Sequence, residues 1–198
     1  MPAIVTDFDE LDLNGTYTYA DYLLWQFKER VELIKGKIFQ MSPAPNTRHQ
    51  TIAGKLYLKI GIFLEDHSCR AFFAPFDVRL FDSKKSALAN LDVYTVVQPD
   101  LCVICDSAKL DERGCLGAPD LVVEILSPGN SQKEMYSKFL LYQECGVREY
   151  WLVDSDRNAV WIYVLNENGR YFGQQPAVKV LQSTIFPGLK IDLEKVFD

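Results

Sequence analysis

The 198-residue sequence has no apolar segment long enough to cross a membrane, no secretory leader, and no internal repeat or low-complexity tract. A membrane-spanning helix needs about 20 mostly apolar residues, so the sequence predicts no membrane association. The lack of repeats argues against a repetitive architecture. Because 48% of the residues are hydrophobic, the chain can bury one sizeable core. We therefore expect a single domain over residues 17–198, preceded by an acidic appendage at residues 1–16.

The sequence also lacks an excess of basic residues, since its formal net charge is −6 at pH 7. Most of this negative charge is in residues 1–30, which leaves residues 31–198 close to neutral. Phosphate neutralisation supplies most of the affinity in nonspecific binding to duplex nucleic acid, so the composition argues against strong binding of that kind. Seven cations could still form a local basic rim or lie singly in solvent: Lys35, Lys37, Arg48, Lys55, Lys59, Lys84 and Lys85.

Cysteine and histidine are both scarce, with five and two residues. The odd number of cysteines without a secretory leader predicts reduced thiols and a cytoplasmic protein. Cys102 and Cys105 have the spacing of a redox or zinc motif, but an odd separation on a strand directs the two sulfurs to opposite faces. We therefore assign them no metal role. His49, at the start of a predicted helix, is expected to cap the helix or lie on the surface, and His67 to lie at its end.

Hydrophobic periodicity and turn signals predict the α/β class. Helices are predicted over residues 17–30, 47–66 and 131–144, and a hairpin over 31–41 that turns at Lys35-Gly36. Strands are predicted over 71–81, 96–105, 120–126, 148–154 and 158–165, with loops at 83–90 and 107–117 and short edge segments over 170–197. The strand, helix and strand between 120 and 154 are expected to form a right-handed crossover between parallel strands.

One carboxylate, Glu124, lies in the middle of the apolar segment 121–126. A charge inside so apolar a strand costs several kcal/mol unless a cation or hydrogen-bond donors compensate it. Alternation along the strand places Asp120 and Glu124 on one face and Leu121, Val123 and Ile125 on the other. We therefore expect a compensating group opposite Glu124.

The predicted helix at 131–144 supplies a candidate cation. At about 100° per residue, Lys138 lies within the same apolar arc as Phe139, Leu141 and Tyr142. A lysine in such an arc must reach water or find an anion. The helix follows directly on the strand that carries Glu124, so this carboxylate is the nearest partner. A purely structural ion pair is the alternative interpretation.

A third acidic residue, Asp100, follows Pro99 in the strand-like segment 96–105. Proline is tolerated only at the start or edge of such a strand. Asp100 and Glu124 could meet on neighbouring strands, where two carboxylates repel each other unless a divalent cation neutralises both. Oxygen ligands suit magnesium or manganese. A nearby lysine suits phosphate chemistry, because it can position a nucleophile or stabilise developing negative charge.

The segments that carry these residues also match the motifs of a known family. The matching stretches are residues 31–37, 41–43, 98–101, 117–128, 138–142 and 146–154, and the likeness covers most of residues 17–198. They resemble the Uma2 family (DUF820), which is often labelled as restriction endonucleases and is regarded as a branch of the PD-(D/E)XK nuclease superfamily. The resemblance implies a restriction-endonuclease-like core, with a mixed central sheet flanked by helices and extra N- and C-terminal strands. It also implies a metal site.

The resemblance assigns residues in this sequence. The acid after proline in the superfamily pattern corresponds to Asp100 and the second acid to Glu124, but the lysine two residues later would fall on Leu126. Related branches carry the lysine on the following helix, where this sequence has Lys138. The helical periodicity points to the same lysine. Glu32 corresponds to an accessory acid that some members contribute from their N-terminal part.

A second Pro-Asp pair, Pro119-Asp120, makes the assignment ambiguous. Asp120 and Glu124 on one strand would have Cα atoms about 13 Å apart at roughly 3.3 Å per residue, too far to share a metal easily. We expect Asp120 instead to accept hydrogen bonds from backbone donors at the strand entrance, or to support the ligands from behind.

These assignments predict a Mg²⁺- or Mn²⁺-dependent deoxyribonuclease that hydrolyses DNA phosphodiester bonds. Asp100, Glu124 and the backbone carbonyl of Ile125 would hold the metal, while Lys138 stabilises the transition state and Glu32 helps to hold metal or water. DNA is the expected partner, and a homodimer is expected, with the strands between Val147 and Val164 as a candidate pairing edge.

Two alternatives stay open. The chain could be a catalytically silent module that binds nucleic acid or protein, because a fold does not guarantee its chemistry. Metal binding separates this alternative from the nuclease. A metal-free glycoside hydrolase with paired carboxylates would need one acid with a raised pKa and an aromatic-lined cleft. The lysine and the Pro-Asp context argue against that enzyme.

Overall fold

The computed structural model describes residues 4–41, 46–81, 93–127 and 132–198. The predicted loop at 83–90 lies outside the described residues. Helices in the described ranges are η1 (Phe8–Glu10), α1 (Tyr19–Tyr22), α2 (Thr47–Leu64), η3 (Ser107–Lys109), α3 (Gln132–Cys145) and α4 (Glu194–Phe197). None of these helices has the length and hydropathy that a membrane crossing requires.

Most of the described strands belong to two six-stranded sheets. The main sheet has the order β12 (Tyr171–Gly173), β11 (Ala159–Leu165), β10 (Glu149–Asp154), β9 (Leu121–Ile125), β6 (Leu101–Ile104) and β3 (Arg70–Phe73). The second sheet has the order β2 (Lys37–Gln40), β1 (Val31–Ile34), β5 (Thr95–Val97), β4 (Val78–Leu80), β8 (Gly114–Leu116) and β7 (Leu110–Asp111). A separate pair is formed by β13 (Val180–Gln182) and β14 (Lys190–Asp192).

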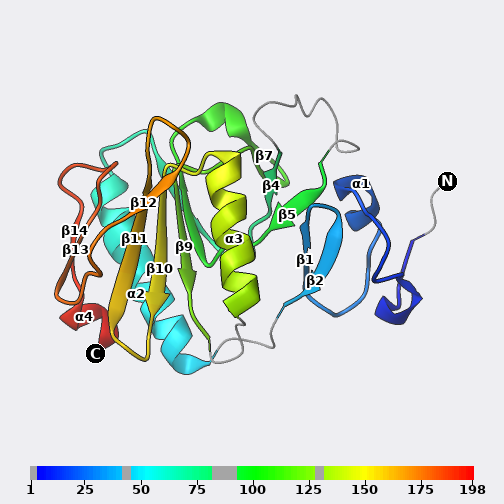
Figure 1. Ribbon diagram of the computed structural model, residues 1–198, viewed down its shortest axis with the longest axis horizontal. Helices are drawn as coiled ribbons and strands as arrows, with labels where there is room; N and C mark the ends of the chain where they lie inside the picture. The colour runs from blue at the N-terminus through cyan, green and yellow to red at the C-terminus, as the bar shows by residue number, and fades with distance from the viewer. Residues whose placement is uncertain (1–3, 42–45, 82–92, 128–131) are drawn as a thin grey trace.

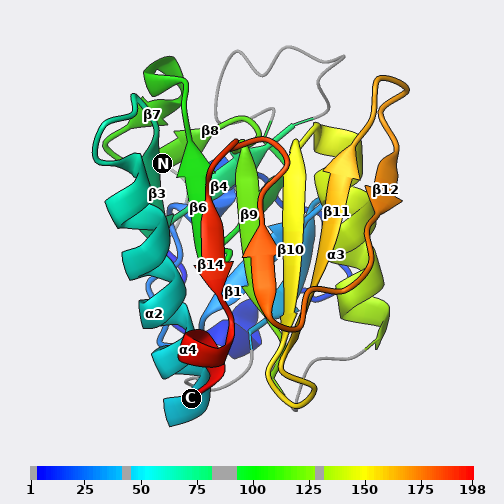
Figure 2. The same cartoon turned by 90° about the vertical axis from the view of Figure 1, so that its left-hand side faces the viewer.

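The main sheet is the centre of the fold, with helices on both faces (Figure 1). On one face, α2, α4 and the pair β13–β14 pack over the sheet (Figure 2) and bury residues such as Leu56, Leu121 and Trp151. On the other face, α3 and part of the second sheet bury residues such as Val122 and Tyr142. This division confirms the predicted alternation along β9, and it leaves Glu124 on the face that α3 covers.

The parallel pair expected around α3 is present. β9 and β10 run parallel, with Glu124 beside Leu152 in the register, and α3 connects them. α3 ends before Gly146, whose positive φ of 87° allows the tight exit from the helix. Because the crossover is short, α3 is held directly against the strand that carries Glu124.

Two predicted strands are each divided between the two sheets. The segment 71–81 forms β3 in the main sheet and β4 in the second sheet, and 96–105 similarly forms β5 and β6. Prolines interrupt both segments, at Pro75 and Pro99, and proline cannot donate a hydrogen bond to a continuous ladder. The predicted continuous strands were therefore wrong. The break at residues 98–100 places Gln98 and Asp100 where the chain passes from one sheet to the other.

The N-terminal predictions have mixed outcomes. The hairpin at 31–41 is confirmed as β1 and β2, with positive φ at Lys35 and Gly36. The helix predicted over 17–30 is wrong, because α1 covers only Tyr19–Tyr22. After α1 the backbone of Leu24 and Gln26 pairs with Val5 instead. The segment predicted as a loop at 107–117 contains the short hairpin β7–β8. The division into an appendage at 1–16 and a domain at 17–198 stays a prediction.

The cysteine prediction needs correction. Cys69 and Cys105 form a disulfide, although the sequence predicted reduced thiols throughout. Cys69 precedes β3 and Cys105 follows β6, and the register of these strands brings the two residues together despite 36 positions of separation. Cys102 faces the other side of the sheet from Cys105, as expected, and it is a thiol outside the disulfide, as are Cys115 and Cys145.

The candidate pairing edge between Val147 and Val164 is also wrong. β10 lies between β9 and β11, and β11 is itself covered by β12, so neither strand is at the edge of the main sheet. The strand at that edge is β12. The sequence missed this because β12 is only three residues long and carries little periodicity.

Candidate active site

Asp100 directly precedes β6, next to the part of the neighbouring strand β9 that carries Glu124. β6 and β9 are antiparallel, and the register pairs Leu101 with Val123, so the next positions along the ladder are Asp100 and Glu124. Both side chains line one cavity of about 310 Å³ between the two sheets and α3. The expected meeting of the two acids therefore occurs in the structure.

His49 and the backbone fix the orientation of Asp100. Its Oδ2 accepts hydrogen bonds from His49 Nε2 at 3.1 Å and from the amide of Ile125 at 2.7 Å. Burial opposes protonation of His49, but the hydrogen bond and charge of Asp100 outweigh this effect and raise the pKa of His49. The surface or capping role expected for His49 is wrong. Asn46 caps α2, and the side chain of His49 is 8% exposed.

Glu124 meets two donors from α3. Lys138 Nζ lies 3.0 Å from Glu124 Oε1, and the hydroxyl of Tyr142 donates to the same oxygen at 2.6 Å. Lys138 and Tyr142 are four residues apart and so share one face of the helix. The cation that the sequence predicted opposite Glu124 is therefore present, together with a hydroxyl donor.

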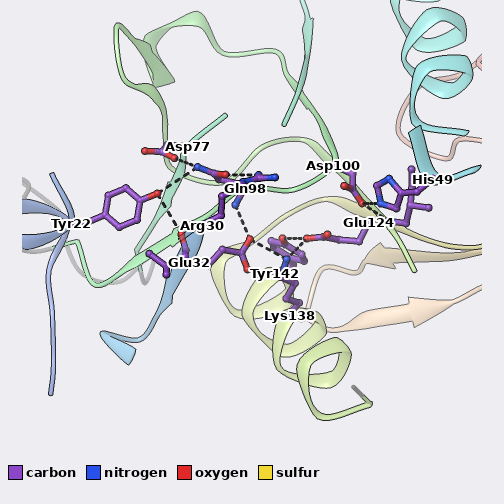
Figure 3. Close-up of polar contacts among 12 residues, drawn as sticks. Tyr22, Arg30, Glu32, His49, Asp77, Gln98, Asp100, Glu124, Lys138 and Tyr142 are labelled. Atoms are coloured by element: carbon purple, nitrogen blue, oxygen red, sulfur yellow. Dashed lines mark hydrogen bonds and ion pairs between the residues drawn. The ribbon is translucent and has the colours of Figure 1, made fainter. Parts of the chain in front are cut away.

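Glu32 holds Lys138 from the second sheet. Its Oε1 lies 3.1 Å from Lys138 Nζ and accepts a hydrogen bond from the amide of Gln98 at 2.8 Å. The lysine thus bridges a carboxylate of β1 and a carboxylate of β9, as Figure 3 shows. Glu32 is 3% exposed, so this ion pair is almost completely shielded from solvent.

The charges of this cluster shift the pKa values of its own members, among them Lys138 and Glu124. Burial opposes the positive charge of Lys138, but Glu124 and Glu32 outweigh burial and raise its pKa above the ordinary value. Burial raises the pKa of Glu124 to about 7, since Lys138 offsets burial only in part and Asp100 and Glu32 add to the rise. Lys138 therefore stays protonated. Glu124 and Glu32 share its positive charge.

The free oxygens of the two acids suit a divalent cation. Asp100 accepts its hydrogen bonds on Oδ2 and Glu124 on Oε1, so Asp100 Oδ1 and Glu124 Oε2 make no hydrogen bond to any described residue. No cluster of three histidine, cysteine or acidic side chains suited to a metal occurs in the described ranges. Two carboxylates, with water and substrate completing the shell, are a usual arrangement for Mg²⁺.

The other predicted residues are placed as follows. Ile125 lines the cavity, and so does Leu126, the position at which the superfamily pattern would put its lysine. Asp120 does not line it. Its carboxylate accepts a hydrogen bond from the amide of Cys105 at 2.8 Å and pairs with Arg148. The expectation that Asp120 satisfies a backbone donor is confirmed.

Sequence reasoning assigned no role to three residues that line or support the cavity. Tyr142 was placed in the apolar arc of α3, but its hydroxyl is a donor to Glu124. Gln98 and Arg30 line the cavity, and Arg30 donates to Gln98 Oε1 at 2.8 Å. The position of Gln98 directly before Pro99-Asp100 was a usable signal. Arg30 had no such signal, because the sequence predicted it at the end of a helix over 17–30, and that helix does not extend beyond Tyr22.

Comparisons with known proteins agree with this architecture. The Uma2 family, described as "Putative restriction endonuclease", matches residues 19–194. The "Uncharacterized protein slr1290" of Synechocystis sp. (strain ATCC 27184 / PCC 6803 / Kazusa) is 26% identical over 152 residues, which are 75% of this chain and 74% of that protein.

A solved structure supports the fold. The "putative nuclease belonging to DUF820" from Anabaena variabilis ATCC 29413 matches with a TM-score of 0.67 and 24% identity, over 91% of this chain and 97% of that one. The restriction-endonuclease-like fold expected from the sequence is thereby confirmed. Because the family match spans nearly the whole chain, the protein belongs to the Uma2 family.

Proposed function

We propose that the protein is a metal-dependent endonuclease that hydrolyses phosphodiester bonds in DNA. One observation carries the proposal. Asp100 precedes β6 next to Glu124 on the adjacent β9, each acid has one oxygen with no hydrogen bond to a described residue, and both share a cavity with the buried cation of Lys138. The family description and the name of the structural relative support nuclease chemistry of this kind.

Asp100 and Glu124 would hold the divalent cation, Mg²⁺ or Mn²⁺, with the backbone carbonyl of Ile125 as a further ligand. When bound, the cation polarises a phosphoryl oxygen and lowers the pKa of water. The protein contributes orientation. His49 and the amide of Ile125 hold Asp100 by one oxygen, and Tyr142 holds Glu124 in the same way, so the second oxygen of each acid would be the one that binds the cation.

Lys138 would stabilise the charge that develops on the phosphoryl group as water attacks phosphorus. An ammonium has three N–H donors, and two of them are directed to Glu32 and Glu124, which leaves one for a substrate oxygen. The raised pKa of Lys138 keeps it protonated, so it serves as a cation and not as a base. Glu32 acts by positioning Lys138.

A catalytically silent module is the second candidate, and one observation favours it. Lys138 already neutralises part of the charge of Glu32 and Glu124, so the cluster could persist as a structural ion pair between the two sheets. Metal binding separates the two candidates, because a purely structural pair needs no divalent cation. The homodimer stays a prediction from the sequence.

The first prediction concerns the two acids. Asp100→Asn and Glu124→Gln should each abolish binding of Mg²⁺ and Mn²⁺ and reduce nicking of supercoiled plasmid to the background, because each removes a charged ligand while keeping the shape of the side chain. Calorimetric titration and agarose-gel nicking assays measure the two effects. Glu167→Gln changes an exposed acid between β11 and β12 and should behave like the wild type.

Retention of full nicking by Glu124→Gln would contradict the assignment of the ligands. If the wild type bound neither metal, with or without DNA, the silent module would become the better account.

Lys138→Ala should lower the nicking rate by about 10²–10³-fold, the usual loss when one donor to a developing anion is removed. Metal affinity should be unchanged or higher, since the acids lose their competing cation. Single-turnover nicking and calorimetry measure the two effects, and a urea titration establishes that the variant is folded. Lys138→Arg keeps the charge with a different geometry and should restore only part of the rate. If Lys138→Ala nicked DNA at the wild-type rate, Lys138 would not stabilise the transition state.

His49→Ala should weaken metal binding by about 10–100-fold, as removal of a group that orients a ligand generally does. Calorimetry with Mn²⁺ is the measurement. His67→Ala is a matched control, because His67 is the other histidine and is exposed just after α2. Equal Mn²⁺ affinity in His49→Ala and the wild type would show that Asp100 needs no support from His49.

A further inference from the structure

A second cavity adjoins the candidate active site. It has a volume of about 360 Å³ and lies along the segment that was expected to be helical. The aromatic side chains of Tyr22, Trp25 and Phe27 line it, together with Lys28 and Arg30. We call this second cavity the aromatic groove. All three aromatic side chains are only partly buried, so they contribute apolar surface that solvent can reach.

The groove borders the candidate active site. Arg30, Pro75 and Gln98 line both cavities. Gln98 also links them through hydrogen bonds, since its backbone N–H donates to Glu32 of the site, its side-chain carbonyl accepts from Arg30, and its side-chain amide donates to the hydroxyl of Tyr22 in the groove (Figure 3). A strand of substrate that leaves the active-site cavity past Arg30 would therefore enter the groove.

The aromatic rings form a connected surface. The ring centroids of Trp25 lie 5.5 Å from those of Tyr22 and 5.7 Å from those of Phe27, with interplanar angles of 53° and 30°. Contacts among rings hold them in place, so the loss of side-chain freedom on binding a planar ligand is small. Aromatic platforms of this kind stack nucleobases in proteins that bind single-stranded nucleic acid.

The charges and polar groups of the groove further restrict the class of ligand that it can bind. Its lining contains two exposed cations, Lys28 and Arg30, against one acid, Glu29, in a chain with a net charge of −6. The cations suit backbone phosphates. The side-chain amide of Gln98 is engaged with Asp77 and Tyr22, so it is not free to read a base edge. The groove thus favours a base held by stacking, with little dependence on sequence.

We propose that the aromatic groove binds an unpaired nucleobase of the substrate strand, next to the phosphate that Asp100, Glu124 and Lys138 act on. This inference deepens the proposed function and rests on it, because it names single-stranded or locally unpaired DNA as the substrate class. A base inside a duplex is paired and stacked, and it can reach such a groove only after it has flipped out, which costs its pairing and stacking.

Fluorescence anisotropy at low ionic strength in EDTA tests the proposal without requiring cleavage. The probes are a labelled 12-nucleotide oligothymidine, the same strand in a duplex, and a 12-unit abasic strand that has the phosphates but no bases. Wild-type protein should bind oligothymidine about tenfold more tightly than either of the other two probes. Trp25→Leu should bind oligothymidine and the abasic strand equally, while Trp25→Phe should keep most of the preference.

Phe172→Leu is the matched control, because Phe172 is an exposed aromatic residue on β12 that does not line the groove. Phe27→Leu provides a second groove variant if Trp25→Leu fails to fold in a urea titration. The proposal is overturned if wild-type protein binds the abasic strand as tightly as oligothymidine, or if the folded groove variants keep the full preference for bases.

The outcome is distinguishable from that of the proposed function. Metal-dependent nicking without a preference for bases would overturn the groove assignment and leave the endonuclease intact. A base preference that depends on Trp25, in a protein that never nicks DNA, would support base binding in the groove and overturn the endonuclease.

Discussion

The ion pairs of the buried Lys138 are the interaction on which the site depends. A single ammonium from α3 contacts Glu124 on the main sheet and Glu32 on the second sheet, and so joins three layers at one point. Removing one partner of such a cluster leaves a buried charge uncompensated, which typically costs 3–5 kcal/mol. The same contacts leave the cavity negatively charged, because three acids line it and Lys138 is the one lysine or arginine buried among them in the described part of the chain. A divalent cation bound in the cavity would neutralise this excess of negative charge.

The core of the site could be predicted because its signals are local. A carboxylate inside the apolar strand 121–126 and a lysine inside the apolar arc of the next helix are each costly alone, and a short crossover forces them together. Asp100 was found because a Pro-Asp pair marks a strand entrance, and the antiparallel register then places it opposite Glu124. The burial of alternate residues along β9 follows the period of two that any strand has.

The other features of the fold and the site depend on contacts between segments far apart in the sequence. Sequence patterns alone could not predict these contacts. The helix predicted over 17–30 was overridden because Val5 pairs with the backbone near Trp25 and the aromatic side chains pack on one another. His49 lies at the start of a predicted helix, and nothing near it in the sequence indicates its contact with Asp100, which is 51 residues away. The disulfide between Cys69 and Cys105 likewise follows from the register of β3 and β6.

We propose that Asp100 and Glu124 form one metal site beside Lys138. A crystal structure of the protein grown with Mn²⁺ tests it most directly, because anomalous scattering locates manganese without reference to activity. The account predicts an anomalous peak within bonding distance of Asp100 Oδ1 and Glu124 Oε2, with Lys138 still between Glu124 and Glu32. A cavity that contains no manganese at saturating concentration, or a peak bound by other residues, would contradict it.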